Sequence, residues 1–194
     1  GLGDVYKRQV LAAAPVAAVE SASVGEQVAY LLAHSENQVV EALAHTAAPA
    51  TDLPATHEGA TQLLTATAED LGVDTAGMAL VDSSGLSPDN RVSAGQLAGV
   101  VAGVARTPAL ATVLEGLPRP GEDSTLGDRF PDAPARQAVA AKTGTLDQTV
   151  SLTGTVTTTS GRVLAFSIIC SDLQWKLEPA RAAVDEAVSA VAGL

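Results

Sequence analysis

The 194-residue sequence predicts a mixed fold of the α/β (α+β) class, in which an antiparallel sheet carries a C-terminal helix and adjoins a helical region. Residues 149–158 alternate threonine or serine with apolar residues, which is the period of a half-exposed strand. Turn-forming residues join this stretch to residues 141–146 before it and 162–170 after it, so we expect a three-stranded meander. After Pro179, apolar residues recur every three or four positions, as in a helix that lies across a sheet.

The first half of the chain has mainly helical periodicity. Apolar residues recur at helical spacing from Val24 to Leu43, and Ser35 falls on the same face. A second helix is expected over residues 57–71, ending before Gly72. Ser93 is expected to cap a further helix that extends through Val104, with a short helical piece after Pro108.

Three stretches between these helices and the sheet lack helical spacing. Residues 76–81 are apolar and predict a short buried strand. Residues 82–90 have the Asp, Ser, Gly, Pro and Asn content of a structured loop. Residues 118–134 are rich in proline and charge, so we expect a long surface loop.

Composition excludes several classes of protein. Apolar residues make up 46% of the chain, which suits a packed core. Aromatic residues make up only 3% and the net charge is −11, and both values argue against a nucleic-acid partner. Cys170 lies among apolar residues and is expected in the core. His34, His45 and His57 lack metal-ligand spacing and are expected to be surface or core residues. We expect no metal, no cofactor and no membrane span.

Residues 1–9 differ abruptly in character from the Ala/Val-rich run that follows them. We interpret residues 1–9 as a non-native leader and residues 10–194 as the remainder of the domain. The native chain is expected to begin further upstream.

Two polar motifs carry the chemistry of this sequence. Lys142-Thr143-Gly144 places a charge and a bare backbone inside an apolar strand, unless it is only a strand that ends in a turn. In Ser35-Glu36-Asn37, the first and third side chains point about 200° apart on a regular helix, so they share a cleft only if the helix breaks. A continuous helix with Asn37 in water is the alternative. Together the motifs suit serine acyl transfer, which needs a hydroxyl, a proton relay and donors for a carboxylate and an oxyanion.

A Ser-x-Asn motif followed by Lys-Thr-Gly resembles the DacB-type penicillin-binding D-alanyl-D-alanine carboxypeptidases/endopeptidases, the serine peptidases of family S13. The resemblance extends through further blocks in the same order: Glu20-Ser21, Leu32 to Asn37, Asp82 to Ser87, Asn90 to Val92, Ser124 to Leu126, Arg129-Phe130 and Ala141 to Leu146. It implies part of a transpeptidase/β-lactamase-like domain that acts through an acyl-enzyme. It also implies peptidoglycan stem peptides and β-lactams as ligands, an extracytoplasmic location and no cofactor.

The same resemblance implies a role for each matching residue. Ser35 would relay a proton, Asn37 would orient the substrate, and Lys142 would supply positive charge for proton transfer and for the terminal carboxylate. The expected substrate-binding residues are Thr143, which would hydrogen-bond the carboxylate, Gly144, which would admit the substrate backbone, and Thr145, whose amide would donate to the oxyanion.

The family's Ser-x-x-Lys motif, which supplies the nucleophile and its base, is missing. The lysines are Lys7, Lys142 and Lys176, and none has a serine three residues before it. We therefore expect the 194 residues to be catalytically silent and the motif to lie in a missing N-terminal part of the same chain. The alternatives are a related β-lactamase or esterase, and a non-catalytic cell-wall binding module that uses the threonine-lined face of residues 149–157.

Overall fold

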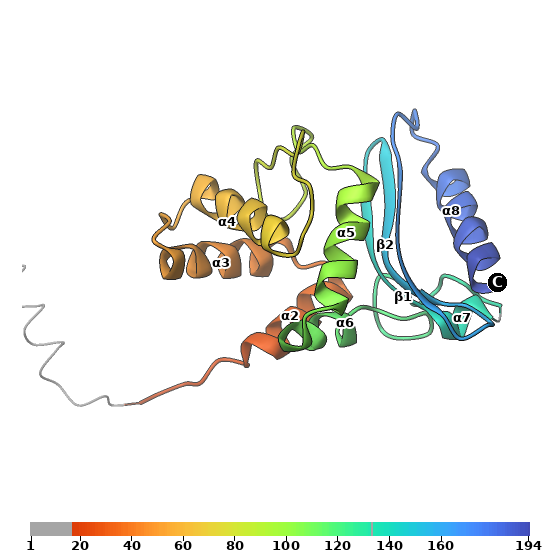
Figure 1. Ribbon diagram of the computed structural model, residues 1–194, viewed down its shortest axis with the longest axis horizontal. Coiled ribbons are helices and arrows are strands. Elements are labelled where there is room, and N and C mark those ends of the chain that lie inside the picture. Colours follow the sequence, from red (N-terminus) through yellow and green to blue (C-terminus); the bar gives the residue numbers. More distant parts are fainter. Residues whose placement is uncertain (1–16, 133) are drawn as a thin grey trace, which may run out of the picture.

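The computed structural model describes residues 17–132 and 134–194; residues 1–9, interpreted as a leader, lie outside the described residues. A three-stranded antiparallel sheet of order β1-β2-β3 stands between helices (Figure 1). Its strands are β1 (Val139–Leu146), β2 (Thr149–Thr157) and β3 (Val163–Cys170). The helical elements are α2 (Val24–His34), α3 (Asn37–Ala47), η1 (Ala48–Thr51), α4 (His57–Asp70), α5 (Ala94–Ala105), η2 (Pro108–Leu110), α6 (Ala111–Glu115), α7 (Ala135–Ala138) and α8 (Leu177–Ala192).

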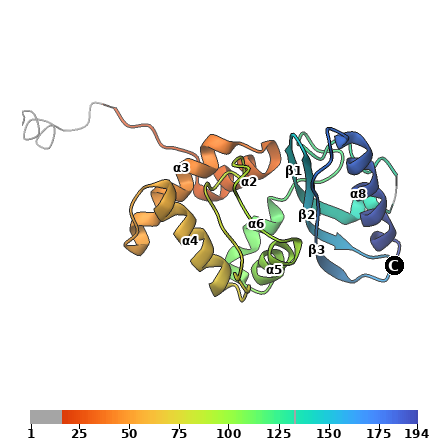
Figure 2. The same ribbon diagram turned by 90° about the horizontal axis from the view of Figure 1, so that it is seen from above.

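The predicted meander and C-terminal helix are confirmed. Asp147-Gln148 closes the first hairpin, so Leu146 pairs with Thr149 and Lys142 with Thr153. Helix α8 covers one face of the sheet and α5 the other, while α3 and α4 lie beyond α5 (Figures 1 and 2). Helix α8 begins two residues before Pro179. The first turn of a helix tolerates proline, because the backbone amide that proline lacks has no hydrogen-bond partner within the helix at that position.

The main core lies between the sheet and α8. Alternate residues of β1 and β2 meet the apolar stripe of α8, and burial of this surface is the chief stabilising term of the fold. The fully or almost fully buried members are Leu126, Phe130, Ala135, Val139, Ala141, Leu152, Val156, Val184, Val188 and Ala192. Cys170 packs against this cluster, as expected.

The opposite face of β2, which carries Ser151, Thr153 and Thr155, is half-buried beneath α5. The Thr153 hydroxyl is bonded to that of Ser167 on β3 at 2.7 Å. The predicted alternation of buried and half-exposed residues along β2 is therefore correct. The face is not open to a ligand, however, which counts against a binding module built on it.

Two expectations for the connecting segments are wrong. Residues 76–81 form no buried strand: Ala79 makes a single bridge to Arg91, and Val81 is 49% exposed. Gly77 has a φ of 76°, which interrupts the extended backbone that a strand needs. The expected surface loop over residues 118–134 is not confined to the surface, because Leu126 and Phe130 are 0% and 2% exposed in the core.

Among the described residues, no single helix is long and apolar enough to cross a bilayer. Helix α5 and the segment Pro108–Glu115 satisfy length and composition only as a pair bent by 105°.

Candidate active site

Lys142 and Ser35 lie 107 residues apart in sequence and are joined by a hydrogen bond. The Lys142 Nζ atom donates to Ser35 Oγ at 2.8 Å and to the carbonyl oxygen of Thr143 at 2.8 Å. Burial lowers the pKa of Lys142 to about 8, because a desolvated ammonium is less stable than a solvated one. In residues 17–132 and 134–194, no carboxylate lies within ion-pair distance of Nζ to oppose this effect.

The helical pattern over residues 24–43 is broken at Ser35. Helix α2 ends at His34, Ser35 adopts the left-handed conformation with a φ of 58°, and α3 begins at Asn37. The Ser35 amide donates to the Leu31 carbonyl, which closes the last turn of α2. The break that a shared cleft requires is present, and the continuous-helix alternative is wrong.

The segment after α6 holds this turn in place. The Thr125 amide donates to the Ala33 carbonyl at 3.0 Å, and the Thr143 hydroxyl donates to the Thr125 hydroxyl at 2.8 Å. Thr125 therefore connects the end of α2 to strand β1. Sequence reasoning placed Thr125 in a family-like block but gave it no role, because nothing local to it indicates either contact.

Strand β1 is an edge strand whose outer side is partly free. The Ala141 amide donates to the Pro118 carbonyl at 2.9 Å, away from β2. Because backbone groups alternate sides along a strand, the amides of Thr143 and Thr145 also face this outer edge. Unpaired edge groups of this kind are able to pair with an extended peptide.

The structure shows a close neighbour for Gly144 but, among the residues it describes, no hydrogen-bond partner for the side chain of Asn37. A Cβ atom on Gly144 would lie 2.3 Å from the Ser151 hydroxyl of β2, so a larger residue there would force that hydroxyl to turn away. Asn37 is half-buried at the start of α3, and its side chain forms no hydrogen bond within the described part of the chain. The roles expected for Asn37, Gly144 and Thr145 stay predictions.

Glu41, one turn after Asn37, is a structural residue that sequence reasoning missed. Its Oε1 atom accepts the amides of Ser83 at 2.9 Å and Ser84 at 2.8 Å, which fixes the loop over residues 82–90 against α3. Burial opposes ionisation of Glu41, but hydrogen bonds from Ser84 and Ser83 and the nearby His57 outweigh it and lower its pKa.

Two of the three histidines lie side by side. The rings of His45 and His57 are 4.7 Å apart, and both lie against Glu41. Their separation in sequence hid this contact, because it depends on how α3 packs against α4.

The chain resembles a known family of proteins over nearly its whole length. A family model described as the D-Ala-D-Ala carboxypeptidase 3 (S13) family matches residues 3–191. Carboxypeptidase DacB of Mycolicibacterium smegmatis is 40% identical over 163 residues, which are 81% of this chain and 35% of that protein. The chain thus spans about a third of this relative's length.

Solved structures show the same fold at lower identity. Penicillin-binding protein 4 (DacB) of Haemophilus influenzae, solved with a β-lactam, superposes with a TM-score of 0.76 at 22% identity, covering 95% of this chain and 48% of that one. The extended-spectrum β-lactamase TLA-3 gives 0.65 at 16% identity, covering 88% and 64%. These likenesses confirm the predicted fold class. With the family match over residues 3–191, they show that the chain belongs to the D-Ala-D-Ala carboxypeptidase 3 (S13) family.

Proposed function

We propose that this chain forms the carboxylate-binding wall of a serine-type D-Ala-D-Ala carboxypeptidase or endopeptidase that acts on peptidoglycan stem peptides through an acyl-enzyme. The observation that carries this proposal is the 2.8 Å bond between Lys142 Nζ and Ser35 Oγ. A lysine whose pKa is about 8 exchanges its proton readily near neutral pH. Bonded to a hydroxyl, it is suited to move a proton through Ser35 to a leaving amine.

The terminal carboxylate of the substrate binds at Lys142 and Thr143. Lys142 supplies a positive charge, and the Thr143 hydroxyl lies on the following residue of the same strand. The outward amides of Thr143 and Thr145 offer an edge along which a peptide extends, with Thr145 as donor to the oxyanion. Asn37 orients the substrate from the start of α3, and Gly144 leaves the strand bare where the peptide crosses it.

The nucleophile and its lysine base come from a Ser-x-x-Lys segment elsewhere in the same protein. β-Lactams bind the completed site as substrate mimics, and the protein acts on the extracytoplasmic side of the membrane, where peptidoglycan lies. The bond to Ser35 supports this proposal over a binding module on residues 149–157, whose threonines lie half-buried beneath α5.

Carboxylate recognition is testable with the chain itself. Diacetyl-Lys-D-Ala-D-Ala and the same peptide with a C-terminal amide are titrated into ¹⁵N-labelled protein. The acid is expected to shift the amide signals of Ser35, Thr143 and Thr145, and the peptide amide to bind at least about tenfold more weakly, because a charge-assisted bond is lost.

Lys142→Ala is expected to weaken binding of the acid at least about tenfold, with Lys142→Met as a second variant that keeps the buried stem. Lys176→Ala is the matched control, since this exposed lysine lies before α8 and outside the site. Equal binding of acid and amide, or binding unaffected by loss of Lys142, would contradict the proposal.

A further inference from the structure

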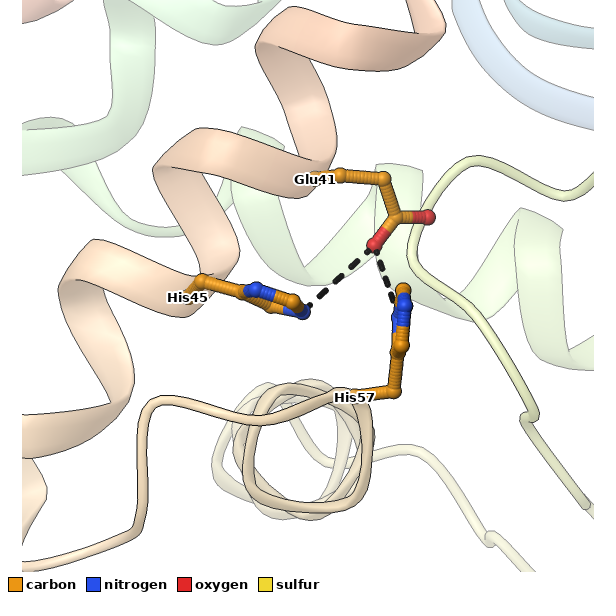
Figure 3. A group of neighbouring side chains, drawn as sticks. All are labelled: Glu41, His45 and His57. Carbon is orange, nitrogen blue, oxygen red and sulfur yellow. Dashed lines mark ion pairs between the residues drawn. The ribbon is translucent and has the colours of Figure 1, made fainter.

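Two histidines and a glutamate converge outside the Ser35–Lys142 pair. Glu41 and His45 are one turn apart on α3, His57 is the first residue of α4, and the three side chains point toward one another (Figure 3). The Oε2 atom of Glu41 lies 3.4 Å from Nδ1 of His57 and 3.9 Å from Nε2 of His45. One potential ligand atom from each residue falls within 4.8 Å of the other two.

Two of these three atoms are buried and form no hydrogen bond among the described residues. Glu41 Oε2 and His45 Nε2 have no hydrogen bond within the described part of the chain, although solvent does not reach them. A buried polar atom left unsatisfied costs about 1–3 kcal/mol. The arrangement is nevertheless held in place, because the other oxygen of Glu41 accepts the amides of Ser83 and Ser84. A cation between the three residues would satisfy both atoms at once.

We propose that Glu41, His45 and His57 bind a zinc ion, with a water molecule as the fourth ligand. Two imidazoles and one carboxylate suit Zn²⁺, whereas Ca²⁺ and Mg²⁺ prefer sites built from oxygen atoms. Bonds of about 2.0–2.1 Å place tetrahedral ligands about 3.3 Å apart. The Glu41–His57 distance already matches this spacing, and the Glu41–His45 distance exceeds it by roughly half an ångström. The two histidine nitrogens lie within 4.8 Å of each other, so metal binding would also draw the two rings together.

The surroundings support an accessible site with a fixed carboxylate. The side chain of His57 is 64% exposed, so the ion would enter from the His57 side. The two backbone amides on Glu41 orient its second oxygen, as outer hydrogen bonds do for ligands in zinc proteins.

The ion would link three segments that sequence separates. Glu41 and His45 belong to α3, His57 to α4, and Ser83 and Ser84 to the loop that Glu41 holds. Because α3 begins at Asn37, zinc is expected to stabilise the helix that follows the Ser-x-Asn turn. This role does not depend on the function proposed for Lys142.

Zinc binding is measured on the full 194-residue chain without a histidine tag. Calorimetric titration with Zn²⁺ is expected to give one ion per chain and a rise in Tm. Cobalt is expected to replace zinc and give the visible absorption of a four-coordinate site. His57→Ala, at an exposed position that the fold tolerates, and Glu41→Gln, which retains an oxygen to accept the Ser83 and Ser84 amides, are each expected to weaken binding at least about tenfold.

His34→Ala is the matched control, because His34 is exposed at the end of α2 and does not belong to the cluster. It is expected to bind zinc as the unaltered chain does. Absence of binding, stoichiometric binding that survives His57→Ala and Glu41→Gln, or an equal loss in His34→Ala would each overturn the proposal. Circular dichroism of every variant separates loss of the site from loss of the fold.

Discussion

Lys142 is a charged residue that the fold disfavours in its charged form. Its stem crosses the half-buried face of β1, and its ammonium group donates to a hydroxyl and a carbonyl rather than to a carboxylate. Desolvation is the cause of its lowered pKa. The buried ammonium group therefore destabilises the fold near neutral pH, and the same desolvation makes its proton easier to transfer.

This property predicts a pH dependence of stability. The pKa of Lys142 is 10.5 in the unfolded chain and about 8 in the folded one, so between these values the unfolded state binds more protons and stability rises with pH. The destabilising contribution is complete below about pH 8 and is relieved toward pH 10.5.

Lys142→Met removes this titration. Urea unfolding at pH 7.5 and pH 10 is expected to show the original chain gaining on the order of 1 kcal/mol relative to the variant, after allowance for partial solvent screening. Parallel stability curves for the two proteins would show that the lysine is not desolvated.

At the scale of elements, α5 is the helix that joins the two halves of the structure. One side packs on β2 and β3, and its C-terminal half lies against the end of α4. Gly103 makes this approach possible, because a Cβ atom there would lie 2.7 Å from both Cβ and the carbonyl oxygen of Leu71. The backbone of Leu71 has little freedom to move, since its amide is bonded within the last turn of α4.

Gly103→Ala is therefore expected to destabilise the protein by about 1–3 kcal/mol through overpacking. Gly95→Ala, on the exposed first turn of the same helix, is the control: its Cβ would meet only the Ser93 hydroxyl at 3.9 Å. There the alanine is expected to be neutral or to stabilise by up to about 1 kcal/mol, as helix propensity predicts. Chemical unfolding of both variants checks the difference, and similar effects would refute the close contact of α5 with α4.

At the scale of the whole molecule, the arrangement explains how Ser35 and Lys142 are brought together within these residues. The sheet is supported by α8 on one face and α5 on the other, and the turn at Ser35 is bonded to β1 from the helical side. These contacts lie within the 194 residues. Ser-x-x-Lys does not occur among them.

The absence of Ser-x-x-Lys predicts that the chain is not acylated by β-lactams. The chain alone, incubated with fluorescent penicillin beside a penicillin-binding protein standard, is expected to show no covalent label, because removal of a catalytic serine and its base leaves little activity. A labelled band at the mass of this chain would show that another serine acts as the nucleophile. In that case Ser35→Ala would show whether Ser35 is that serine.

Regular elements were predictable wherever the local pattern has a single interpretation. The alternation in β2 and the apolar stripe of α8 arise from backbone periodicity, which depends only on neighbouring residues. The sequence also showed that a shared cleft needs a break at Ser35. It did not show that the break occurs, because the spacing of the apolar residues there also suits a continuous helix.

The sequence by itself thus determined the three-stranded sheet, the C-terminal helix and the identity of the polar motifs. The tertiary structure alone decided that Lys142 reaches Ser35, that Leu126 and Phe130 enter the core, and that His45 and His57 meet at Glu41. Each of these contacts joins residues whose separation in sequence carries no signal of contact. They form because burial of apolar surface fixes how α3, α5 and α8 pack, and packing sets the positions of the side chains between them.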